Sequence, residues 1–121
     1  MTFNIVARNQ DDHVKNIAFL MDKRGTWSLA PAFDMTYSYN PAGRWTATHQ
    51  MTMNGKREGF TLEDFRACAG HALLKRGRSD ALIDEVRAAV MRWPQFAEEA
   101  QVGEEWQEVI RRNHRLEFPR A

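Results

Sequence analysis

Hydrophobic positions in the first 35 residues fall into short clusters separated by polar turns. The apolar residues between positions 3 and 7 fit either the end of a helix or a short strand, because the window is too short to show a period. Two further clusters, 17–21 and 27–29, are joined by Asp22-Lys23-Arg24-Gly25 and predict a β-hairpin. Pro31 limits further strand pairing because it has no N–H to donate. Residues 36–60 are expected to be mostly irregular.

From residue 61 onward, apolar residues recur at spacings of three and four, which predicts helices. Thr61 and the acids after it predict a helix start, and Gly77 is expected to stop that helix. Ser79 is expected to cap the next helix, and Pro94 to end or kink it and to open a short third helix. The expected apolar faces are Leu62, Phe65, Ala69, Ala72 and Leu73, then Leu82, Val86, Ala89, Val90 and Trp93, then Trp106, Val109 and Ile110.

The fold class that follows is mainly α with a small β-hairpin. We expect one domain over 1–121, in which 1–35 holds the hairpin and the polar loops around it, 36–60 is irregular, and 61–121 is a helical bundle. The four tryptophans, Trp27, Trp45, Trp93 and Trp106, are expected to pack in a core, and inert burial is expected for Cys68.

Charge and composition exclude several classes of protein. With 17 Lys and Arg against 16 Asp and Glu, the net charge is +1, so direct nucleic-acid binding is not expected. The arginines between 111 and 120 are read as a basic helix end. No apolar run approaches the roughly 18 residues of a membrane span, and no signal peptide is visible, so a cytoplasmic protein is expected. One cysteine forms no internal disulfide.

The densest chemistry lies in Asn9-Gln10-Asp11-Asp12-His13-Val14-Lys15-Asn16, followed after the predicted hairpin by Phe33-Asp34. Phosphoryl transfer needs an acceptor hydroxyl held in line and oxygen ligands for Mg²⁺. A carboxylate can accept the hydroxyl proton, and an Asn oxygen with a second carboxylate suits Mg²⁺. The hairpin returns the chain, so we expect Asp11, Asn16 and Asp34 to face one pocket. Taken singly, Asp12 reads as a solvated or loop-capping acid, and His13 as hydrogen-bonded to the loop backbone.

The string Asn-x-Asp-Asp-His-x-Lys-Asn, followed by Trp-x-Leu-Ala-Pro-Ala-Phe-Asp, resembles the HipA family, serine/threonine kinases that act as toxins in bacterial toxin–antitoxin systems. Asn54-Gly55-Lys56 and the helices behind it match more loosely. The resemblance implies the helical carboxy-terminal lobe of a HipA or phosphoinositide-kinase-like kinase. It also implies Mg²⁺ and ATP as cofactors, a protein hydroxyl as acceptor, and a HipB-like antitoxin as partner.

Carried over to this sequence, the resemblance implies that Asp11 is the general base and that Lys15 offsets charge near the transferred phosphate. Asn16 and Asp34 would hold Mg²⁺. The residues expected to border the nucleotide are Asp11, Asp12, His13, Phe33 and Asp34.

The chain departs from the family in one large respect. Only residues 1–10 precede Asp11, and no Gly-rich loop or lysine lies among them, so the lobe that covers ATP is not expected here. We therefore expect little activity alone, and association as a homodimer or with an amino-terminal kinase lobe in trans. Two alternatives stay open: a non-catalytic remnant or interaction module, and a metal-dependent hydrolase with Asp11, Asp12, His13 and Asp34 as ligands.

Overall fold

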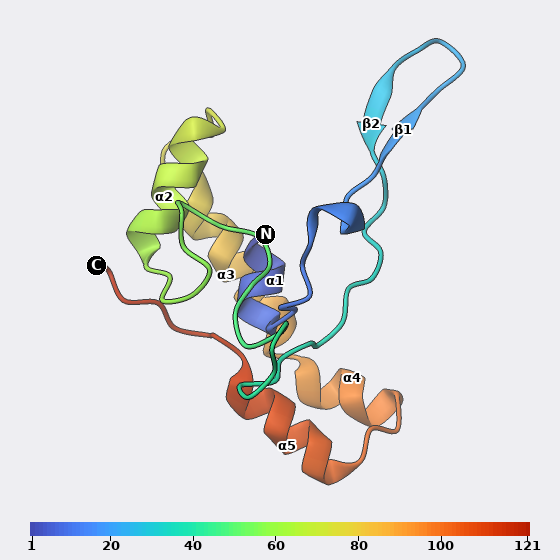
Figure 1. Cartoon of the computed structure of the whole chain (residues 1–121), viewed down its shortest axis with the longest axis vertical. Coiled ribbons are helices and arrows are strands. Elements are labelled where there is room, and N and C mark those ends of the chain that lie inside the picture. The colour runs from blue at the N-terminus through green and yellow to red at the C-terminus, as the bar shows by residue number, and fades with distance from the viewer.

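The computed structural model describes all residues 1–121 and is mainly α with one small β-hairpin, as predicted (Figure 1). None of its helices combines the length and apolar character that a membrane span requires. In chain order, the elements are α1 (Thr2–Ala7), the 3₁₀ turn η1 (Val14–Asn16), β1 (Phe19–Met21), β2 (Trp27–Leu29), α2 (Leu62–His71), α3 (Arg78–Val90), α4 (Trp93–Glu99) and α5 (Glu104–Asn113).

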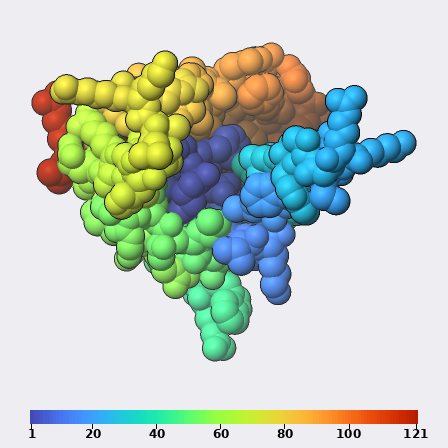
Figure 2. Space-filling view, turned by 90° about the horizontal axis from the view of Figure 1, so that it is seen from above, coloured from blue at the N-terminus to red at the C-terminus, as the bar shows by residue number.

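Helix α1 forms the centre of the molecule, and later segments of the chain surround it (Figures 1 and 2). Ile5 and Val6 are both fully buried. Ile5 belongs to a core cluster with residues of α2 and α3, among them Phe65 and Ile83, and Val6 packs with Val90 at the end of α3. Burying an aliphatic side chain of this size contributes about 1.5–3 kcal/mol. The short α1 is therefore held by tertiary packing, and the polar segment 9–16 follows directly from it.

The predicted hairpin is present and projects from the rest of the fold (Figure 1). Strands β1 and β2 pair antiparallel, with Phe19 opposite Leu29 and Met21 opposite Trp27. The turn between them is held by the Asp22 carboxylate, which accepts hydrogen bonds from the backbone N–H groups of residues 24 and 26 at 2.8 and 2.9 Å. All six strand residues are exposed. The hairpin therefore presents unpaired apolar side chains to solvent.

The start of α2 follows the predicted cap and ties down part of the irregular segment 36–60. Thr61 and Asp64 form a capping box. The Asp64 carboxylate, 2% exposed, also accepts hydrogen bonds from Lys56 Nζ at 2.8 Å and from Asn54 Nδ2 at 2.9 Å. Burial alone raises the pKa of the Asp64 carboxyl, but these donors and Thr61 outweigh it, and the pKa lies far below its ordinary 3.8. The Asn54-Gly55-Lys56 turn is thus anchored on the first turn of α2.

Two predicted helix boundaries are wrong. Helix α2 ends at His71 and does not continue to Gly77, because Leu73 adopts a left-handed conformation (φ 56°) and is 91% exposed. Gly77, also left-handed at φ 81°, is the N-cap of α3, and Ser79 lies inside that helix. The buried residues of α3 are accordingly Ser79, Ile83 and Val90, a face that is turned relative to the predicted one.

Helix α4 begins one residue before Pro94, as the sequence predicts within a position, and α5 follows Gly103. The indole N–H of Trp93 donates to the Gln107 carbonyl at 3.0 Å and joins the two helices. The prediction that all four tryptophans pack in a core is wrong: Trp27, Trp45 and Trp106 are 61–66% exposed. Cys68 is partly buried against the Ile5 cluster.

The segment after α5 runs back across the molecule to α1 and α2. The Arg115 N–H donates to the Val6 carbonyl at 2.8 Å, and the Leu62 N–H donates to the Pro119 carbonyl at 2.9 Å. Phe118 packs on both core clusters and lies edge-on to Phe65, with ring centroids 4.9 Å apart. This return brings residues 114–119 against the helix that precedes the 9–16 segment.

Candidate active site

Segment 9–16 leaves α1 as a loop that is fixed to residue 38 and ends in η1. Arg8 ends α1 with a left-handed conformation (φ 60°). The Ser38 N–H donates to the Arg8 carbonyl at 3.0 Å, and the Gln10 N–H donates to the Ser38 carbonyl at 2.9 Å. Two backbone bonds therefore hold the start of this loop, hereafter the 9–16 loop, against the chain that follows the hairpin.

The 9–16 loop buries some of its polar side chains and leaves others at the surface. Gln10 and Asp12 point into the molecule and are 0% and 1% exposed. Asp11 lies between them, is partly exposed, and its carboxylate accepts no hydrogen bond from the chain. The carboxylate predicted as general base is therefore open to contact with a group outside the chain.

Asn16 is oriented by a bond within the loop. Its Nδ2 donates to the Asp11 carbonyl at 3.2 Å. This leaves the Asn16 Oδ1 without a donor from the chain, and Asn16 lines a cavity beneath the loop. The amide oxygen is thus available as a ligand.

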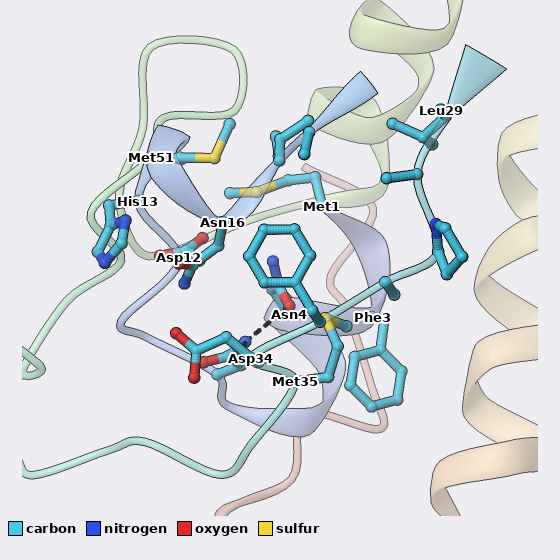
Figure 3. A pocket seen from close by; sticks show the side chains of 17 residues that line it. Met1, Phe3, Asn4, Asp12, His13, Asn16, Leu29, Asp34, Met35 and Met51 are labelled. Carbon is cyan, nitrogen blue, oxygen red and sulfur yellow. Dashed lines mark hydrogen bonds between the residues drawn. The ribbon is translucent and has the colours of Figure 1, made fainter. Parts of the chain in front are cut away.

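Asp34, which follows the hairpin, lines the same cavity from the opposite direction (Figure 3). Its backbone is left-handed (φ 54°), a conformation that Asp and Asn tolerate better than other non-glycine residues. Asn9 Nδ2 donates to the Asp34 carbonyl at 3.4 Å, while no group of the chain binds the Asp34 carboxylate. The structure therefore brings Asn16 and Asp34 to one cavity; Asp11 lies beside it but is not part of its lining.

The cavity has a volume of about 280 Å³ and combines polar and apolar walls (Figure 3). Asn9 Oδ1 and His13 Nδ1 are both buried without a hydrogen-bond partner, although buried polar atoms are nearly always paired. The predicted hydrogen bond from the His13 ring to the loop backbone is absent. The cavity lining includes the polar residues Asn9, Asp12, His13, Asn16 and Asp34 and the apolar residues Met1, Phe3, Phe33, Met35 and Met51.

The donors at this cavity suit a hard divalent cation. Mg²⁺ prefers oxygen and is usually held by one or two protein groups together with waters and phosphates. The Asn16 Oδ1 and the Asp34 carboxylate are such oxygens. By contrast, no three His, Cys, Asp or Glu side chains lie close enough to hold a metal ion. The four-residue ligand set that the hydrolase interpretation needs is therefore not assembled.

Asp12 is buried, although one of the two readings of the sequence made it a solvated acid. Its Oδ1 accepts the Gln50 N–H at 2.8 Å, and its Oδ2 lies 2.9 Å from His49 Nδ1. The His49 side chain is fully buried. Asp12 therefore lines the cavity with a carboxylate that is already committed to the protein, which matches the loop-capping interpretation and excludes the solvated one.

Sequence reasoning missed three residues around Asp12: Gln10, His49 and Arg115. Arg115 NH1 lies 2.8 Å from His49 Nε2, and Arg115 NH2 donates to Gln10 Oε1 at 3.1 Å. Burial, followed by the nearby charge of Arg8, lowers the pKa of Arg115 to about 10, so it remains charged at neutral pH. No local pattern signals these contacts, which join positions up to 105 residues apart.

The two remaining predicted residues differ in their relation to the cavity. Phe33 lines it and is 44% exposed. Lys15 lies in η1, is exposed, and is not part of the lining.

The family model for the HipA-like C-terminal domain matches residues 1–93. The chain belongs to this family. The match covers the 9–16 loop, the hairpin, Asp34 and helices α1–α3, and it ends at the start of α4. Searches among curated proteins and among solved structures gave no significant match.

Proposed function

We propose that this chain is the catalytic and metal-binding half of a HipA-type serine/threonine protein kinase, which transfers a phosphoryl group from ATP to a protein hydroxyl. The observation that carries the proposal is the meeting of Asn16 and Asp34 at one cavity, each with an oxygen that no group of the chain occupies. Family membership supports the same reaction class.

Each residue of the loop has a separate role in this proposal. Asp11, partly exposed and unpaired, accepts the proton of the acceptor hydroxyl and orients that hydroxyl. Asn16 and Asp34 would hold Mg²⁺, which would neutralise charge on the phosphoryl group that ATP donates. His13 and Phe33 border the nucleotide from the cavity wall, and Lys15 lies at the solvent side, where it can offset charge on the transferred phosphate.

A second polypeptide lobe completes the site in this proposal. The β1–β2 hairpin offers Leu20, Trp27 and Leu29 at 55–67% exposure, and apolar surface of this kind marks interaction sites. An amino-terminal kinase lobe supplied in trans would cover both the hairpin and the nucleotide. A HipB-like antitoxin and a second copy of the chain are the other partners that the family suggests.

The decisive experiment supplies a HipA-type amino-terminal lobe to the 121-residue chain and follows phosphate transfer to a protein acceptor. Asp11→Asn is expected to reduce transfer by about 10²–10⁴-fold, the usual contribution of a general base. Asp84→Asn, at an exposed position of α3, is the matched control. Activity that survives Asp11→Asn overturns the base assignment.

Titration of the chain with Mg²⁺ and ATP in a calorimeter separates the proposal from an interaction module. Binding of nucleotide that depends on Mg²⁺ supports the kinase half. Lobe or antitoxin binding through the hairpin without any affinity for Mg²⁺ or ATP would instead favour the interaction module, which the exposed hairpin also suits.

A further inference from the structure

One residue from the other end of the chain, Arg115, connects to both neighbours of Asp11. Gln10 Oε1 accepts hydrogen bonds from Arg115 NH2 at 3.1 Å and from Arg8 NH1 at 3.0 Å. Asp12 is reached through His49, which lies 2.9 Å from Asp12 Oδ2 and 2.8 Å from Arg115 NH1. The guanidinium of Arg115 therefore connects to the 9–16 loop on either side of the proposed base.

The direction of these hydrogen bonds follows from the chemistry of the groups. A guanidinium only donates, so the His49 Nε2 must accept from Arg115. The ring proton then resides on Nδ1, and this N–H donates to the Asp12 carboxylate. Arg115 thus selects the tautomer of His49 that can bind Asp12.

Arg115 is itself fixed to α1. Its backbone N–H donates to the Val6 carbonyl at 2.8 Å and its NH1 to the Ile5 carbonyl at 3.3 Å. The guanidinium also lies over the Phe60 ring, 5.5 Å from its centroid. A planar fork can reach His49 and Gln10 together, whereas a lysine ammonium at this position is a single point of attachment.

The restraint extends from Asp11 to Asn16. The carbonyl of Asp11 accepts the Asn16 Nδ2, which turns the Asn16 Oδ1 away as a free ligand. A shift of the peptide between Gln10 and Asp12 would therefore move the proposed base and a proposed Mg²⁺ ligand together.

We propose that Arg115 is a positioning residue: through Gln10 and His49 it fixes the 9–16 loop so that Asp11 and Asn16 are presented together beside Asp34. This inference rests on the proposed function, and it assigns a role to a residue beyond the 1–93 range of the family match.

The test uses the full 121-residue chain with Arg115→Met and Arg115→Lys, and Arg120→Met as the control at an exposed position. Mg²⁺ binding is measured by calorimetry, and amide hydrogen exchange is followed along the chain. We expect Arg115→Met to weaken Mg²⁺ binding about 10- to 100-fold, as loss of an outer-shell partner does. Exchange should accelerate in residues 10–16 while the amides of α2 and α3 keep their protection. Arg115→Lys, which retains the charge but not the fork, should show the same local effect.

A second pair of variants keeps the inference falsifiable if Arg115→Met does not fold. His49→Asn retains a donor near the Nδ1 position and should preserve Mg²⁺ affinity better than His49→Phe, which has none. Equal effects of the two His49 variants, or Mg²⁺ affinity and loop exchange unchanged in Arg115→Lys, would overturn the inference. If the wild-type chain binds no Mg²⁺, the proposed function fails. Hydrogen exchange then decides the positioning role alone: acceleration confined to residues 10–16 supports it, and uniform acceleration overturns it.

Discussion

His49 and Asp12, 37 residues apart in the sequence, meet with 2.9 Å between Nδ1 and Oδ2, and both side chains are fully shielded from solvent. Both Asp12 oxygens accept an N–H, one from the His49 ring and one from the Gln50 backbone. Each oxygen of the Asp12 carboxylate therefore has its own N–H donor within the protein.

Asp12→Asn should therefore destabilise the fold, although it preserves the shape of the side chain. The amide has only one oxygen, so its NH₂ must face one of the two N–H donors. We expect the free energy of unfolding to fall by about 1.5–3 kcal/mol, the usual contribution of hydrogen bonds to a charged group, measured by urea denaturation. Asp84→Asn, whose carboxylate is 73% exposed, should change it by less than about 0.5 kcal/mol.

The Asp64 carboxyl predicts a pH dependence of stability. Its pKa in the folded chain lies below the ordinary 3.8, because the Lys56, Asn54 and Thr61 donors outweigh burial. Between the two pKa values the unfolded chain binds more protons, so the stabilisation is complete above about pH 4 and is lost as the pH falls. Urea denaturation from pH 2 to 6 should show a flatter acid limb for Asp64→Asn than for wild type. Parallel curves would show that other carboxyls cause the acid loss.

Substitutions of Asp34 can separate the effect of its backbone conformation on stability from its proposed role as a Mg²⁺ ligand. Its left-handed conformation suits Asn and Gly but strains Ala. We expect Asp34→Asn and Asp34→Gly to keep near wild-type stability and Asp34→Ala to lose about 1 kcal/mol, measured by thermal unfolding. All three variants should lose Mg²⁺ affinity in calorimetry. Retention of Mg²⁺ binding by Asp34→Asn would remove Asp34 from the ligand set.

The hairpin predicts association of the isolated chain at high concentration. Replacing Trp27 and Leu29 by Ser and Thr should reduce self-association in light scattering by about tenfold or more, because it removes two exposed apolar side chains from the expected contact surface. Trp106→Ser removes an equally exposed indole from α5 and is the matched control. An equal effect of the control would show that association is not specific to the hairpin.

The sequence predicts the parts of the fold that depend on local signals. The Asp22–Gly25 turn and the Thr61 cap both have residues whose preference is strong and local, and both are present. The predicted end of α2 was wrong at Leu73, which continues the apolar period but has a left-handed backbone. The spacing of apolar side chains does not determine the backbone conformation at the end of a helix.

The site divides in the same way. Asn16 and Asp34 could be predicted because a loop, a hairpin and a family motif place them at a known interval, and they line one cavity. His49 and Arg115 could not be predicted, because each is a single polar residue with distant partners. His49 lies 37 positions from Asp12, and Arg115 lies 66 positions from His49. Their burial comes from the return of the segment after α5 to α1, which has no local signature.

The contact between Gln10 and Arg115 also has a consequence for the order in which the protein matures during synthesis. The two residues are 105 positions apart, and at about 5–20 residues per second a ribosome needs on the order of 5–20 s to travel between them. During that interval the 9–16 loop has been synthesised but Arg115 has not. Asp11 and Asn16 therefore acquire their final geometry only late in translation.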